Sequence, residues 1–578
     1  MRRPVLPRLG LSLLVLLLLF TSGATTQAAA DKLDILIYGG SLAACAAART
    51  AAADAPAAKI GLVIPYPARA YGGLATVGGQ NFWDVRLYHG DGVEGRGEKP
   101  AFPQGGSFAR WYARTGHFYG THELAALLNH ELAGRANLKT YWSADVEVVR
   151  READGRPGQV WLRELVRGPE GFLRWGRWRL PVKARLFIDA SEDGRLARLA
   201  GVPVTTGRAD WPPCYLAPDR DATGRLLPRQ QAATLMFKVT GVQPGRYPDM
   251  VFLQDEDGTW GAYGGLAAYL TDPVITAFNR RYGPQGYALK PLNAAQNGNR
   301  SGQWWVNALL IFEVDGRANF RDRGTTYYPR DLRPEALETD RAWARARRLL
   351  KNPEFLAALR RFPGFHRAEL VLGGDGYPEV GEILYLRETV HAVRPVRHGV
   401  QQKTHPAGKE ETAYTVTPRQ VYLAGPGPGS GEDRHHYATR IGLGFYWLDI
   451  NAYRYRDLQA PDGRFRWPVT AALRPDYSES TPGPGARPYH PVYLPYDTLI
   501  SPQAPNVLLP GAAASIASLA WAELRVLPNL ALLGDAAGAA AAHSLECGRD
   551  PARFTPADLK ILQARLATRH GARLEKTP

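Results

Sequence analysis

The stretch that decides the fold is DKLDILIYGGSLAACAAARTAAADAPAAKIGLVIP, from Asp31 to Pro65. A short apolar run at 35–37 leads into paired glycines at 39–40, and a segment of small, helix-favouring residues follows. A second apolar run covers 60–64. Strand, glycine-rich turn, helix and strand make a βαβ unit, so we predict an α/β fold built on a parallel sheet.

The turn in this unit has the chemistry of a dinucleotide site. Gly39 and Gly40 would let a pyrophosphate approach the backbone N–H groups at the positive end of the following helix. Ala43 and Ala44 offer a surface that packs closely on the sheet, although Ala44 stands where a third glycine is usual. Ile64 stands where an acidic residue usually accepts hydrogen bonds from a ribose. From this stretch alone, a dinucleotide site and an empty α/β turn are equally good interpretations.

The length and the amino terminus bound the protein's class. A chain of 578 residues with 45% hydrophobic and 22% charged residues predicts a globular protein of more than one domain. Three early arginines, an apolar run and small residues at 28–30 predict an export signal over residues 1–30. No later stretch is apolar for long enough to predict a transmembrane anchor in the mature protein. We therefore expect a periplasmic or secreted protein.

Charge and cysteine content exclude several functions. The formal net charge is +16, but the arginines are spread along the chain and no nucleic-acid-binding module is evident. Three cysteines are too few for a disulfide framework, and their spacing predicts no metal site. We therefore expect neither a nucleic-acid partner nor a metal.

The pattern along the chain predicts a domain assembled from both ends. Strand-like segments around 144–183, separated by DGRPG and GPEG turns, predict a small antiparallel meander. From residue 205 the content of aromatic residues, arginine and proline rises, and near the carboxyl end small residues return. We predict a split Rossmann-like domain over 31–204 and 490–578, interrupted by a mixed substrate domain over 205–489.

Further fragments follow the βαβ unit at intervals along the chain. They are YGG (71–73), IDASEDGRLARLAGVP (188–203), YLRET (385–389), NVLLPGAA (506–513), RVLP (525–528) and GDAAG (534–538). In order and spacing they resemble the family of FAD-dependent oxidoreductases, which has a glutathione-reductase-like or fumarate-reductase-like FAD fold and several exported members. The resemblance covers nearly the whole mature chain.

The resemblance implies non-covalent FAD with contacts from five regions of the chain. It places the pyrophosphate at the first turn and the flavin ring near the last of these fragments, expected to open the final helix with its positive dipole end. The implied cofactor-binding residues are Gly39, Gly40, Ser41, Ala43, Ala44, Gly72, Gly73, Asp189, Gly194, Gly511, Gly534, Asp535 and Gly538.

Candidate chemistry lies in EILYLRETVHAVRP, at 382–395. Oxidation by a flavin requires a group that takes or gives the accompanying proton, and Arg387, Glu388 and His391 could supply charge and proton transfer. An internal Arg–Glu pair that braces a domain interface is an equally good interpretation.

Two functions therefore stand open. The first is an exported FAD-dependent oxidoreductase that abstracts a hydride from a small organic substrate and passes electrons to an unidentified acceptor. The second is a non-catalytic or weakly cofactor-binding relative that acts as a binding protein. The second is motivated by departures from the family pattern at Ala44, Ile64, Asn451, Ala512 and Asp535.

Overall fold

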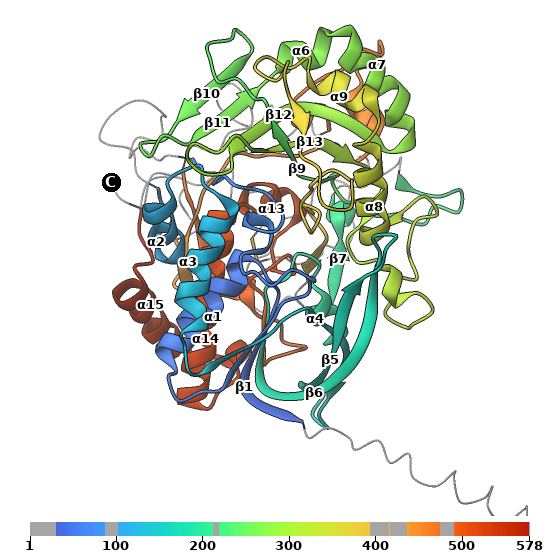
Figure 1. Cartoon of the computed structure of the whole chain (residues 1–578). Coiled ribbons are helices and arrows are strands. Elements are labelled where there is room, and N and C mark those ends of the chain that lie inside the picture. The colour runs from blue at the N-terminus through green and yellow to red at the C-terminus, as the bar shows by residue number, and fades with distance from the viewer. Residues whose placement is uncertain are drawn as a thin grey trace, which may run out of the picture.

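The computed structural model describes residues 30–86, 102–211, 219–393, 415–416, 436–473 and 490–576 (Figure 1). Residues 1–29 of the predicted export signal lie outside the described residues. Among those described, no helix has the length and apolar character that a membrane crossing needs.

A parallel sheet forms the centre of the first structural unit. Its strands run in the order β3-β2-β1-β6-β20. Their bounds are Leu138–Tyr141, Ile60–Val63, Asp31–Tyr38, Leu173–Asp189 and Val507–Leu508. The apolar runs form buried strands because a parallel sheet is covered on both faces. The predicted α/β, Rossmann-like class is confirmed, and strands from both ends of the chain share one sheet.

The predicted antiparallel meander is confirmed. It consists of β4 (Ala144–Arg151), β5 (Pro157–Arg167) and the first half of β6, paired antiparallel in that order. The third strand does not stop at the meander. It continues without a break into the parallel sheet, so that one long strand serves both.

Helices rich in small residues lie on one face of this sheet. α1 (Leu42–Asp54) packs along α14 (Leu527–Cys547), although the two are nearly five hundred residues apart. They appear side by side as blue and red helices in Figure 1. The surrounding helices are α2 (Gly106–Thr115), α3 (Thr121–Ala133), α4 (Arg195–Leu199), α13 (Ser518–Leu524) and α15 (Pro556–His570).

The second unit is a mostly antiparallel sheet with its own core. The strand order is β10-β11-β12-β13-β9-β16, and β8 pairs with β13. The strands span Met250–Gln254, Trp260–Gly264, Tyr287–Gln296, Trp304–Ile311, Phe237–Thr240, Glu369–Leu370 and, for β8, Ala233–Thr234. The helices are α6 (Leu266–Thr271), α7 (Pro273–Tyr282), α8 (Thr339–Leu349), α9 (Pro353–Leu359) and α11 (Thr470–Leu473). This unit lies at the top of Figure 1.

Short strand pairs accompany the two sheets. β7 (Val204–Thr206) pairs with β17 (Val390–Ala392), which lies inside the segment that carries the candidate chemistry. The other two pairs are β14 (Val314–Asp315) with β15 (Leu337–Glu338), and β18 (Arg440–Gly444) with β19 (Val492–Pro495). The pairing of β7 with β17 brings residues 385–392 to the carboxyl edge of the parallel sheet.

Candidate cofactor and active site

The turn between β1 and α1 is held in an open shape by tight backbone contacts. Gly39 has a positive φ of 125°, and a Cβ there would lie 2.7 Å from the carbonyl carbon of Ala190. The Ser41 hydroxyl donates to the Ala190 carbonyl at 2.6 Å and accepts from the Ala44 N–H at 3.3 Å. Ser41 therefore caps α1, and the first N–H groups of that helix are left for another acceptor.

A second glycine pair crosses this turn. The Gly72 N–H donates to the Gly40 carbonyl at 3.0 Å. The Gly73 N–H donates to the Tyr66 hydroxyl at 3.3 Å, and that hydroxyl donates to the Ala70 carbonyl at 2.7 Å. The Tyr66 ring fills the space beside Gly40, where any Cβ would overlap it. These contacts bring the two glycine pairs together, and Tyr66 holds them in place.

The turn after β6 forms the third wall. The buried Asp189 carboxylate accepts from the Ser191 hydroxyl at 2.6 Å and from the Ala197 N–H at 2.7 Å, and burial raises its pKa to about 6. Gly194, at a φ of 59°, packs against Val390. Both residues shape this turn, and the next three residues after Asp189, namely Ala190, Ser191 and Glu192, line the cavity described next. A direct contact of Asp189 or Gly194 with the cofactor stays a prediction.

One cavity joins these walls to the candidate catalytic segment. Its free volume is about 40 Å³. Small-molecule sites span roughly 300 to 1,000 Å³, so side chains must move apart before a large ligand enters. The lining residues are Ser41, Leu42, Ala43, Gly72, Leu74, Ala190, Ser191, Glu192, Tyr385, Leu386, Arg387, Glu388, Gly511, Ala512, Trp521, Arg525, Leu527 and Leu530.

Two guanidinium groups flank Tyr385 at one end of the cavity. The Arg387 guanidinium carbon lies 4.7 Å from the Tyr385 ring centre, and its side chain donates to the Ala232 carbonyl at 2.7 Å. Burial lowers the pKa of Arg387 to about 10, and among the described residues no carboxylate pairs with it. Arg525 donates to the Tyr385 hydroxyl and pairs with Asp449 at 2.6 Å. This end of the cavity is therefore positive.

Glu388 and His391 form a separate buried pair. His391 Nε2 lies 3.5 Å from Glu388 Oε1, which also accepts a hydrogen bond from the Ser518 hydroxyl. The His391 ring is fully buried on β17, 6.0 Å from the Trp521 ring, and lies outside the cavity lining. The sequence grouped Arg387, Glu388 and His391. The structure keeps the last two together and directs the first toward Tyr385.

The glycines of GDAAG have a different place from the one predicted. α14 begins at Leu527, so Gly534 and Gly538 lie in the helix interior and do not open it. A Cβ on Gly534 would overlap the carbonyl of Ala43, and one on Gly538 would overlap that of Ala47. These two glycines allow α14 to pack on α1. The prediction that they present a helix end to the flavin is wrong.

Asp535 has a structural role that the sequence did not indicate. Its carboxylate pairs with Arg49 at 3.1 Å and accepts from the Thr50 hydroxyl at 2.7 Å. It also accepts from both the N–H and the hydroxyl of Ser107 at 2.7 Å, at the start of α2. This carboxylate therefore joins three helices, and its contact with the cofactor stays a prediction.

Several residues in and around the cavity were not singled out from the sequence. Glu192 lines the cavity, and burial followed by the charge of Asp193 raises its pKa to about 7. Behind Arg387, burial lowers the pKa of Lys290 to about 7 and raises that of Asp84 to about 6. Glu192 lies in the fragment IDASEDGRLARLAGVP, but no local sequence pattern marks Lys290 or Asp84. Only their burial near other charges reveals them.

The residues present fit a dinucleotide, except at the adenosine ribose. The start of α1 opens on the cavity at Ser41, Leu42 and Ala43, as a pyrophosphate requires. The buried Nε atoms of Arg387 and Arg525 have no hydrogen-bond partner, so this end can take an acceptor from a ligand. Ile64 is fully buried in the core and offers nothing to a ribose.

Structural comparison gives only distant likenesses. The chain is 13% identical to the myxobacterial chondrochloren halogenase CndH over 63% of this chain and 65% of that one, with a TM-score of 0.29. It thus covers slightly less than two thirds of the halogenase. It is 12% identical to p-nitrophenol 4-monooxygenase PnpA from Pseudomonas putida over 64% and 70%, at a TM-score of 0.27. It is 12% identical to a PqsL variant of P. aeruginosa over 94% of both chains, with a TM-score of 0.30. TM-scores this low carry no argument about substrate.

The sequence comparisons are clearer about the family. No curated protein matches the chain. The model of the family described as FAD dependent oxidoreductase matches residues 34–566, which includes every wall of the cavity. The chain therefore belongs to the FAD-dependent oxidoreductases, and its cofactor is FAD.

Proposed function

We propose that the protein is an exported enzyme that oxidises a small organic substrate and passes the electrons to an acceptor outside the cytoplasm. The observation that carries the proposal is one continuous cavity, which runs from the start of α1 to the Arg387–Tyr385–Arg525 group. When bound, FAD supplies the hydride-accepting chemistry. The predicted signal at 1–30 supports export.

The two ends of the cavity would divide the work of binding. The free N–H groups at the start of α1 would hold the pyrophosphate, with Gly72 and Gly511 allowing the backbone to come close. Arg387 and Arg525 would supply positive charge at the reacting end, where negative charge develops during reduction. Trp521 and Leu530 would exclude water between the two ends.

Proton transfer would fall to groups that titrate near neutral pH. Glu192 lines the cavity with a pKa of about 7, so at that pH its carboxyl oxygen can hold or release a proton. Tyr385 presents its hydroxyl to Arg525 inside the cavity. We assign Glu192 the proton-accepting role, and Tyr385 with Arg387 the role of orienting the substrate.

An absorption spectrum of the purified protein tests the proposal directly. We expect oxidised-flavin bands, and quenching of tryptophan fluorescence when FAD is added to protein stripped of it. An Arg387→Ala variant should keep flavin and lose substrate-dependent bleaching of those bands, whereas Arg345→Ala on α8 should behave as the parent. A folded protein that takes up no FAD would favour the non-catalytic relative.

A further inference from the structure

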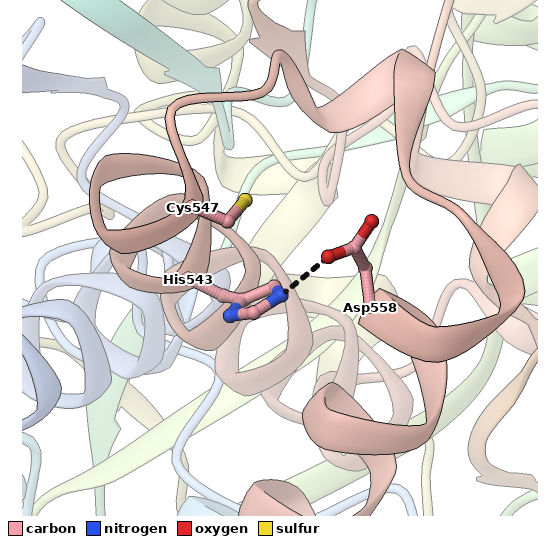
Figure 2. A group of neighbouring side chains, drawn as sticks. All are labelled: His543, Cys547 and Asp558. Carbon is pink, nitrogen blue, oxygen red and sulfur yellow. Dashed lines mark hydrogen bonds and ion pairs between the residues drawn. The ribbon is translucent and has the colours of Figure 1, made fainter.

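Three possible metal ligands converge where α14 ends and α15 begins (Figure 2). His543 and Cys547 are four residues apart on α14 and so project from the same face of its last turns. Asp558 faces them from the first turn of α15. One nitrogen, one sulfur and one carboxylate oxygen all lie within 4.8 Å of one another.

The spacing of two of these atoms already suits a metal ion. His543 Nε2 lies 3.1 Å from Asp558 Oδ1. Two ligands of a tetrahedral Zn²⁺, each at roughly 2.0 to 2.2 Å from the ion, are themselves about 3.4 Å apart. An ion would replace the hydrogen atom that His543 and Asp558 share. Cys547 is free, and its nearest hydrogen-bond acceptor is the Ser544 carbonyl at 4.0 Å, so its sulfur can turn inward at little cost.

The groups around the three ligands would support an ion. The other ring nitrogen of His543, Nδ1, lies 3.5 Å from the carboxylate of Glu546. Asp558 Oδ2 accepts hydrogen bonds from Arg549 Nε at 3.0 Å and from the Thr555 N–H at 2.8 Å, which hold this carboxylate in place. A histidine backed by a carboxylate and a hydrogen-bonded carboxylate ligand are regular features of zinc sites.

We propose that His543, Cys547 and Asp558 bind one Zn²⁺ ion. A thiolate, an imidazole and a carboxylate together favour zinc over magnesium or calcium, and Cys547 is partly exposed, which leaves the fourth position to water. The thiol proton is released on binding, while the His543 ring keeps one proton at Nδ1 facing Glu546. The ion would tie the carboxyl end of α14 to α15.

The same contacts without an ion make a hydrogen-bonded clamp between the two helices. In that case Asp558 caps α15 and pairs with Arg549, His543 adds one hydrogen bond, and Cys547 contributes nothing. A substitution of Cys547 therefore distinguishes a zinc site from a hydrogen-bonded clamp, because Cys547 takes part in none of the hydrogen bonds to Asp558.

The experiment is a titration of the full-length, chelator-treated flavoprotein in a Cys214→Ser background, first with Zn²⁺ and then with Co²⁺. Calorimetry with Zn²⁺ in two buffers should show one site and the release of about one proton per ion. Difference spectra with Co²⁺ should show a thiolate-to-cobalt charge-transfer band. No such band, or Zn²⁺ binding without proton release, would overturn the proposal.

Matched variants locate the ion. Cys547→Ser should abolish the cobalt band and weaken Zn²⁺ binding, while Cys45→Ser, in the core of α1, should change neither. Glu546→Gln should weaken binding by roughly tenfold, the usual effect of losing a partner of a ligating histidine. Flavin content and thermal melting of each variant before Zn²⁺ is added show that it is folded. Binding unchanged in Cys547→Ser would contradict the site.

Discussion

Two pairs of glycines are in contact with α1 or directly precede it, and their structural roles differ. Gly39 and Gly40 precede α1 and let the chain turn so that the helix start faces the cavity. Gly534 and Gly538 lie inside α14 and let its backbone touch that of α1. The first pair clears room for a ligand, while the second clears room for a helix.

Composition cannot distinguish these two uses of glycine. Both stretches are alanine-rich, and both would read as a glycine turn that opens a helix. What separates them is where the helix starts: Ser41 caps α1 directly after its glycines, whereas α14 begins at Leu527, about two turns before Gly534. Substitutions in the first glycine pair should therefore mainly reduce cofactor binding, whereas substitutions in the second pair should mainly reduce stability.

The largest effect is expected at Asp535, between the two glycines of α14. Asp535→Ala leaves the Arg49 guanidinium buried and unpaired, and loss of one partner of a buried pair costs about 3–5 kcal/mol. Chemical denaturation should show this loss. Asp462→Ala, which removes an exposed pair with Arg464, should leave the denaturation midpoint unchanged. Full stability with lost flavin would instead make Asp535 a cofactor contact.

Gly538→Leu should act through the helix contact. The new side chain meets the backbone of α1, which cannot move aside cheaply, so we expect a loss of roughly 1–3 kcal/mol or more. Gly302→Leu, where nothing lies within 4 Å, is the control and should be near neutral. Equal midpoints for the two variants would show that α14 does not pack on α1 in this way.

Gly40→Glu should instead reduce cofactor binding more than it reduces stability. It places a carboxylate beside the start of α1 and displaces the Tyr66 ring, so flavin content should fall sharply while the protein still melts cooperatively. Flavin absorbance per protein, with Gly302→Glu as the control, measures the effect. Undiminished flavin in Gly40→Glu would remove the pyrophosphate from this turn.

The smallest effect concerns pH and Glu192. Its pKa of about 7 in the folded protein lies above the usual value of 4.5 for a glutamate, so the folded protein binds the proton more tightly than the unfolded chain does. The contribution of this group to stability is present in full below pH 4.5 and falls as pH rises toward 7. Thermal melting of Glu192→Gln across that range should lack this slope. The same slope in both proteins would assign it to another group.

The sequence predicted the sheet better than the helices on it. β1, β2 and the meander follow from apolar runs and turn residues close to them in the chain, because strand character is a local property. That β6 runs through both the antiparallel and the parallel part of one sheet was not predictable, since no turn signal separates or joins its halves. The contact of Gly72 with Gly40 was not predicted either, because the two residues are far apart in the chain.

For the site, the sequence by itself determined the glycine turn at Gly39 and Gly40, because a turn between a strand and a helix is carried by consecutive residues. The family and the cofactor followed from the resemblance of fragments spread along the whole chain. Only the tertiary structure decided the rest. It placed Asp535 in a helix junction, separated Arg387 from His391, and gathered Glu192, Tyr385 and Arg525 around one cavity. Burial and charge pairing arise from residues distant in the chain, and no local pattern records which distant residues will meet.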